Sequence, residues 1–180
     1  MPPLLRLASA IAALLLLAGE AVAGGFVFSA TGAANAANPA QKVAVGEKLA
    51  PAELRRRFKG YEVSITQGED CAICAAITGP AGRLEVHFNG RARTVVQIIS
   101  RDKQATDTLG NRIGDPVAAA VGTSAVCESG DEMTCASTRL KGLSYVVGGA
   151  ENCPIGSGDG KKPMDIPSCA KIAGFSVGRR

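Results

Sequence analysis

The sequence has little of what catalysis and metal binding commonly require. It contains no tryptophan, two tyrosines, five phenylalanines and a single histidine, His87. A Ser-His-Asp hydrolase would have to use that histidine, and no nucleophile-elbow motif surrounds a serine. The six cysteines do not form two closely spaced pairs of the kind that zinc sites use, and no glycine-rich loop ends in Lys-Ser or Lys-Thr as phosphate-binding loops do. The sequence therefore predicts a protein that is not an enzyme and holds no metal and no cofactor.

The scarcity of aromatic residues also limits the hydrophobic core, so aliphatic side chains and disulfides must supply most of the stability. The formal net charge is a modest +4, and its clearest cluster is the segment LRRRFKG at 54–60. Outside the cytoplasm such charge meets anionic envelope polymers or acidic proteins, and nucleic acid is not expected as a partner. A solvated helix face is the simpler interpretation of this cluster.

The N-terminus has the layout of a secretory signal. Arg6 precedes an apolar run from Leu7 to Ala18, and a small-x-small cleavage pattern ends at Ala23. The run is too short to span a bilayer, and no later segment is apolar enough to do so. Glu20 stands where a lipoprotein signal needs its lipidated cysteine, so no lipid anchor is expected. Residues 1–23 are thus predicted to be a signal peptide, and the mature bacterial protein is predicted to be periplasmic or secreted.

Two further regions follow the predicted signal. Residues 24–47 are small, polar and mostly without period, which indicates a flexible leader. Residues 48–180 have the length and the patterns of a single α+β domain. We expect its fold to be a single antiparallel sheet of about five to seven strands, with two short helices and disulfides. The expected elements are a helix at 51–58, a strand at 61–65, a hairpin at 84–100, a helix at 116–121 capped by Asp115, and strands at 142–149 and 171–178.

The hairpin at 84–100 allows a sharper prediction from the parity of its residues. Leu84, Val86, Val96 and Ile98 are apolar and even-numbered, whereas the odd positions are mostly polar. Directly paired residues share a face of the sheet, so the loop needs an odd residue count to keep one apolar face. This favours a three-residue turn with a glycine bulge near Asn89-Gly90 over a two-residue turn.

The six cysteines of a predicted exported chain imply three disulfides. They are Cys71, Cys74, Cys127, Cys135, Cys153 and Cys169. Cys127 and Cys135 bracket a polar turn between two short strands. Cys153 and Cys169 bracket a Gly- and Pro-rich stretch, and closing a loop of that size stabilises the fold by roughly 3 kcal/mol in the chain-entropy model.

The pairing of Cys71 and Cys74 stays open. In a regular strand two residues at this spacing lie about 10 Å apart, beyond disulfide reach, so they bond to each other only across a tight turn. A redox Cys-x-x-Cys centre needs a helix that starts at the first cysteine, and Asp70 would disfavour a thiolate there. A thiol-disulfide oxidoreductase at Cys71 and Cys74 is therefore the less favoured alternative.

The order of several motifs resembles a known family. A strand ending in NG leads to TVVQIISRD and DTLGNRIGD, then to a short helix, to the cysteines at 127 and 135, and to LSYVVGG. This pattern is similar to the RpoE-regulated lipoprotein family, bacterial envelope proteins of unknown function, mainly from Leu84 to Gly149. The resemblance implies that Cys127 and Cys135 are bonded to each other, that the protein resides in the cell envelope, and that it is linked to envelope stress. It supplies no catalytic residues.

These observations predict an exported, non-enzymatic protein that binds a partner in the cell envelope, either an envelope protein or an anionic envelope polymer. The candidate contact residues are Lys161, Lys162 and Asp159, in the loop between Cys153 and Cys169. A long loop tied at both ends loses less entropy on binding. The alternative is an inhibitor of a lysozyme or protease that acts through the same loop.

Overall fold

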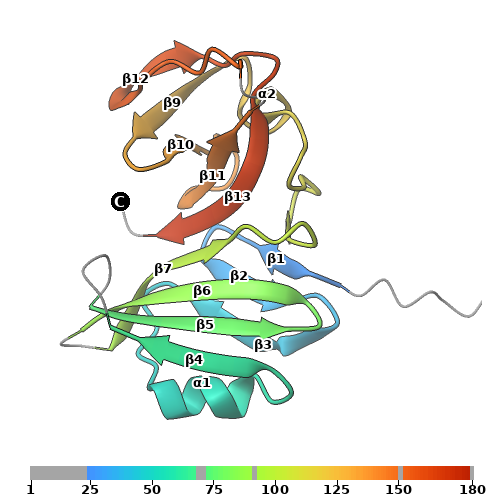
Figure 1. Ribbon diagram of the computed structural model, residues 1–180, viewed down its shortest axis with the longest axis vertical. Coiled ribbons are helices and arrows are strands. Elements are labelled where there is room, and N and C mark those ends of the chain that lie inside the picture. The colour runs from blue at the N-terminus through green and yellow to red at the C-terminus, as the bar shows by residue number, and fades with distance from the viewer. Residues whose placement is uncertain (1–23, 68–71, 91–92, 150–151, 179–180) are drawn as a thin grey trace, which may run out of the picture.

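The computed structural model describes residues 24–67, 72–90, 93–149 and 152–178, and in these the chain folds mostly into strands (Figure 1). The first seven strands are β1 Phe26–Phe28, β2 Gly32–Asn35, β3 Asn38–Ala44, β4 Glu62–Thr66, β5 Ile73–Gly79, β6 Gly82–Asn89 and β7 Thr94–Ser100. The later strands are β8 Thr106–Asp107, β9 Ser124–Ser129, β10 Met133–Ala136, β11 Leu143–Gly148, β12 Asp159–Asp165 and β13 Lys171–Gly178. The helices are α1 Pro51–Arg57 and α2 Val117–Val121.

The strands form two sheets, which corrects the expectation of one sheet in an α+β domain. The small sheet has the order β3-β2-β1-β8, and the large sheet has the nine-stranded order β12-β9-β10-β11-β13-β7-β6-β5-β4. In Figure 1 the long curved strand β13 joins the upper strands β9–β11 to the lower strands β4–β7. The fold is mostly β because segments taken for leader and loop supply further strands.

Residues 24–47 form β1, β2 and β3 in the structure, where the sequence analysis expects a flexible leader. The side chains of Phe26 and Phe28 alternate into the core and are fully buried. The Phe28 ring stacks on Phe175 of β13, with ring centroids 5.4 Å apart. β2 consists of small residues because it lies close to β3: a Cβ on Gly32 would lie 2.2 Å from the carbonyl oxygen of Val43.

The hairpin of β6 and β7 confirms the parity argument but not the predicted turn. Val86 pairs with Ile98, and Leu84, Val86 and Ile98 share the core face as predicted. Val96 does not, because it is only partly buried and Val95 lies in the core in its place. At the end of the hairpin Asn89 pairs with Thr94, which leaves an even loop of four residues. The change of register falls at Val96, an extra residue in β7, so a bulge inside the strand restores the parity.

The two expected helices are confirmed, with one correction. α1 has proline in its first turn and ends before Gly60, as predicted. α2 has Pro116 at its N-cap position, and no side chain caps it. The carboxylate of Asp115, the predicted cap, accepts a hydrogen bond of 2.8 Å from the backbone N–H of Arg112 and closes the preceding turn.

A buried carboxylate fixes the connection between β8 and α2. The Asp107 side chain accepts hydrogen bonds from the backbone N–H groups of Leu109 and Asn111, at 2.8 and 2.9 Å. The side-chain amide of Asn111 and the Tyr145 hydroxyl also donate to it, each at 2.7 Å. Burial raises the pKa of Tyr145 to about 12, and the adjacent Asp107 carboxylate adds to the rise. The DTLGN segment therefore has a structural role.

The disulfides agree with the sequence where the structure describes them. Cys127 bonds to Cys135, across β9 and β10, and Cys153 bonds to Cys169. Cys74 is also disulfide-bonded. Cys71 lies outside the described residues, as does the predicted signal peptide, so the partner of Cys74 stays open as it does in the sequence.

Candidate functional site

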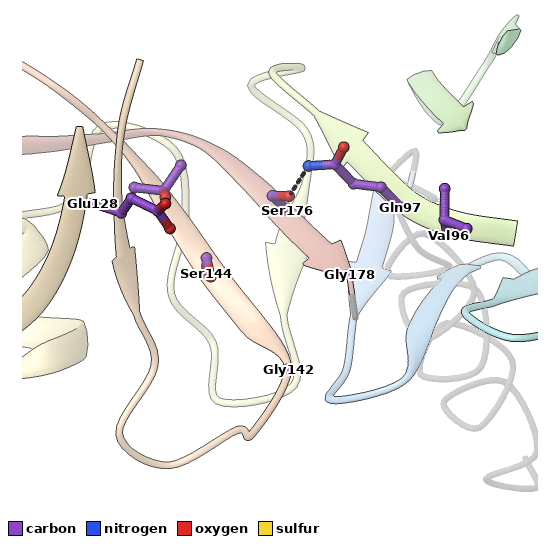
Figure 2. Close-up of a pocket in the computed structure, with 8 residues that line it drawn as sticks. Val96, Gln97, Glu128, Gly142, Ser144, Ser176 and Gly178 are labelled. Atoms are coloured by element: carbon purple, nitrogen blue, oxygen red, sulfur yellow. Dashed lines mark hydrogen bonds between the residues drawn. The ribbon is translucent and has the colours of Figure 1, made fainter. Parts of the chain in front are cut away.

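A shallow pocket of about 320 Å³ lies on the outward face of the large sheet (Figure 2). It crosses β7, β13, β11, β10 and β9, and we call it the polar trough. Its lining residues are Val96, Gln97, Glu128, Thr134, Gly142, Ser144, Ser176 and Gly178.

Strand alternation places these residues on the outward face. On β13 the side chains of Phe175 and Val177 enter the core, so Ser176 between them faces outward. On β11 Tyr145 is fully buried, and Ser144 beside it lies on the same outward face as Ser176. The two serines are directly paired in the ladder between β11 and β13. The trough is thus assembled from residues that are more than thirty positions apart in the sequence.

The trough is hollow because its floor is built from small residues. Gly142 has a φ of +93°, which a side chain would strain, and the chain turns there into β11. Gly178 lies opposite on β13 and donates a backbone hydrogen bond of 3.3 Å to the Gly142 carbonyl. Serine and glycine at these positions leave the backbone of β11 and β13 uncovered by bulky side chains, whereas Gln97 and Glu128 form the walls.

The lining suits hydrogen bonding to a polar group. The Gln97 side-chain amide donates a hydrogen bond of 3.0 Å to the Ser176 hydroxyl. The Gln97 carbonyl oxygen and the Thr134 hydroxyl are further polar groups along the trough. Among the described lining residues Glu128, which is exposed, is the one with a charge. None of these residues is a histidine, cysteine, lysine or aromatic residue.

Metal-binding clusters and membrane-spanning helices are missing from the described residues. No group of three or more His, Cys, Asp or Glu side chains among them lies close enough to hold a metal ion. Neither helix of the described chain is long and apolar enough to cross a membrane.

The residues that the sequence analysis selects for binding lie elsewhere, on the edge strand β12. Asp159, Lys161 and Lys162 belong to this strand, which pairs with β9, so the stretch between Cys153 and Cys169 is not an open loop. The Asp159 carboxylate accepts the backbone N–H groups of Lys161 and Lys162, both at 2.9 Å. These hydrogen bonds lower the pKa of Asp159.

The composition of β12 also explains the two lysines without a binding role. Lysine, proline and a bulge are common at sheet edges, where they prevent pairing with other chains. β12 has Lys161, Lys162 and Pro163 together with a change of register between Asp159 and Pro163. The expected inhibitor loop of the alternative hypothesis is therefore an edge strand in the structure.

The polar trough was not predicted from the sequence. Its residues are ordinary polar residues of strands, and only the register of β11, β13 and β7 brings them together. The one available signal was the presence of serines between buried residues in the strands at 143–148 and 171–178.

Comparison with known proteins supports the fold alone. No protein-family model and no curated protein matches the chain. The chain is similar in structure to the uncharacterized protein YfeY from Escherichia coli, with a TM-score of 0.52 and 15% sequence identity, over 76% of this chain and 93% of that one. This fits a bacterial protein of unknown function, and membership of the RpoE-regulated lipoprotein family stays a prediction.

Proposed function

We propose that the protein is an exported binding protein of the cell envelope that holds an extended, uncharged segment of a partner protein in the polar trough. The observation that carries the proposal is the row of Ser176, Ser144 and Gln97 across a hollow in a rigid sheet. Hydroxyl and amide groups of this kind both donate and accept, as the peptide groups of an extended chain require.

The chemistry of the lining favours a peptide over the other expected partner, an anionic envelope polymer. Glu128 is the only charged residue that the structure describes in the lining, and it would repel a polyanion. The lining residues within the described ranges also form no aromatic platform of the kind that often stacks on sugar rings. The disulfides of the described chain support export, because such bonds persist in oxidising compartments.

Site-specific photocrosslinking in intact bacteria tests the proposal. A benzoyl-phenylalanine is placed at Gln97 or Thr134, two trough residues that are neither fully buried nor disulfide-bonded. The matched control is Thr78, an exposed strand residue on β5 that lies outside the trough. We expect a discrete adduct with one envelope protein from both trough positions and none from Thr78.

A variant in which a bulky side chain fills the trough tests whether the adduct depends on the trough. Thr134→Trp places a bulky residue in the trough, on a strand that tolerates aromatics, and Thr78→Trp is its control. We expect unlabelled wild type and Thr78→Trp to compete for the adduct and Thr134→Trp to fail. Adducts of equal yield at Thr78, or competition by Thr134→Trp equal to that of wild type, would refute the proposal.

A further inference from the structure

A second pocket, of about 280 Å³, lies where three turns meet at one end of the molecule. The β2–β3 hairpin contributes Asn35, the last residue of β2, and Gln41 of β3. The connection from α1 to β4 contributes Lys59 and Tyr61, and the β5–β6 turn contributes Ala81. In Figure 1 these turns gather on the right of the lower half, near the start of β1. We call this site the Tyr61 pocket, and it shares no residue with the polar trough.

A buried hydrogen-bond network fixes the polar groups of the Tyr61 pocket. Asn35 and Gln41 are only 4% and 6% exposed. The Asn35 carbonyl oxygen accepts the backbone N–H of Ala37 at 2.9 Å, which orients the amide. Both hydrogens of the Asn35 amide are then used, one on the Gln41 carbonyl oxygen at 2.7 Å and one on the Tyr61 hydroxyl at 2.8 Å.

The same network leaves two donor hydrogens over. The Tyr61 oxygen accepts from Asn35 and from the backbone N–H of Ala81, at 3.2 Å, so both of its acceptor positions are occupied. Its own O–H has no acceptor among the residues that the structure describes. The Gln41 amide donates one hydrogen to the Lys59 carbonyl at 3.1 Å, and its other hydrogen is likewise without an acceptor in the described chain. Two donor hydrogens fixed in this way favour a ligand that accepts hydrogen bonds.

The charge at the rim identifies the kind of acceptor. Lys59 is exposed, and it is the only charged residue among the described residues of the lining. It forms no ion pair with any residue of the described ranges. Pro80 and Ala81 supply apolar wall beside the two donors. Two neutral donors, one cation and an apolar wall match an anion with a short hydrocarbon part.

We propose that the Tyr61 pocket binds a small carboxylate with a short apolar tail. The carboxylate accepts the O–H of Tyr61 and the free amide hydrogen of Gln41, and the ammonium of Lys59 balances its charge. The tail packs against Pro80 and Ala81. This site is independent of the trough, so it can succeed or fail without any consequence for the proposed function.

Titration with propionate, followed by amide resonances in NMR spectra at constant ionic strength, tests the proposal. Propionamide is the matched neutral probe. We expect saturable shifts of the amides of Gly60, Tyr61 and Ala81 with propionate in the millimolar range, since so small a ligand makes few contacts. With propionamide we expect at least tenfold weaker binding.

Substitutions of the rim lysine separate specific from general charge effects. Lys59→Gln is expected to weaken propionate binding at least tenfold, and Lys59→Arg to retain it. Lys103→Gln, at an exposed lysine of the β7–β8 connection, is the control for lost charge and should bind as wild type does. Tyr61→Phe also removes the hydrogen-bond acceptor for Asn35 and Ala81, so we expect this variant to fold poorly. The test of the proposal therefore relies on the lysine variants. Equal shifts with propionamide, shifts without saturation, or equal effects of Lys59→Gln and Lys103→Gln would each overturn the proposal.

Discussion

The hydrogen bond between Tyr145 and Asp107 permits a quantitative prediction. Tyr145→Phe removes one buried hydroxyl without changing the packing of the ring, which contacts Phe175 at a centroid distance of 5.9 Å. The lost bond of 2.7 Å ends on a buried carboxylate, and bonds to charged groups contribute about 1.5–3 kcal/mol. Asp107 keeps three other donors, from Leu109 and Asn111, so the fold should survive. We expect the variant to be less stable by this amount at pH 7.

The pH dependence gives the same bond a second, independent signature. The folded pKa of Tyr145 is about 12, above its ordinary value of 10, so the folded state keeps its proton where the unfolded state loses it. Stability from this group is therefore complete below pH 10 and is lost as the pH rises towards 12. The loss is about 1.4 kcal/mol at pH 11. The difference between wild type and Tyr145→Phe should shrink by that amount between pH 8 and pH 11.

Urea unfolding followed by far-ultraviolet circular dichroism measures both effects, because the protein has no tryptophan to report on folding. The two proteins differ at residue 145 alone, so the contributions of all other groups cancel in the difference. The disulfides must be shown by mass to stay intact at the alkaline pH. A difference below about 0.5 kcal/mol at pH 7, or one that is constant up to pH 11, would refute the reasoning.

Three further predictions concern the disulfides and the Arg57 ion pair. Replacing Cys153 and Cys169 together by alanine opens a loop of sequence separation 16 and should cost about 3 kcal/mol in the free energy of unfolding, measured by urea titration; a loss below about 1 kcal/mol would contradict the loop-closure argument. Glu47→Gln removes an ion pair of 2.8 Å with Arg57, which holds the pKa of Glu47 below its usual value although burial raises it. We expect Glu47→Gln to lower the free energy of unfolding by about 0.5–1 kcal/mol at neutral pH. The contribution of the ion pair is lost as the pH falls below 4.5, so this difference from wild type should vanish in acid. A difference that does not change with pH would exclude the ion pair as its cause. Non-reducing peptide mapping of protein recovered from the envelope should find Cys74 fully bonded to Cys71, whereas a mixture of free and bonded forms would revive the oxidoreductase alternative.

The sequence predicted local elements well where their own residues determine them. The helix at 51–57 follows from Pro51 and Gly60, and the β6–β7 face follows from the parity of its apolar residues. The leader was misread because β2 consists of Gly-Ala-Ala-Asn, a composition with almost no strand propensity. Its strand conformation depends on contact with β1 and β3, and the spacing of Phe26 and Phe28 was the only local sign.

The binding sites could not be predicted, because both depend on long-range register. Ser144 and Ser176 become neighbours only when β11 pairs with β13, with a bulge between Val146 and Val147. Asn35 and Gln41 come from the β2–β3 hairpin and Tyr61 from the connection before β4, and all three are otherwise ordinary polar residues. Lys161 and Lys162 were predicted to bind a partner because they are charges in a glycine-rich stretch. In the fold they lie on β12, at the protected edge of the large sheet.

The position of β13 has a consequence for the timing of folding. This strand is the last of the described chain, yet it lies in the middle of the large sheet, between β11 and β7. Until residues 171–178 are available, β7 and β11 each present an unpaired ladder, and the halves of the sheet have nothing to join them. Folding of the large sheet therefore cannot finish before residues 171–178 have emerged. Until then the open ladders of β7 and β11 are edges on which other chains can pair, and the arrival of β13 closes both at once.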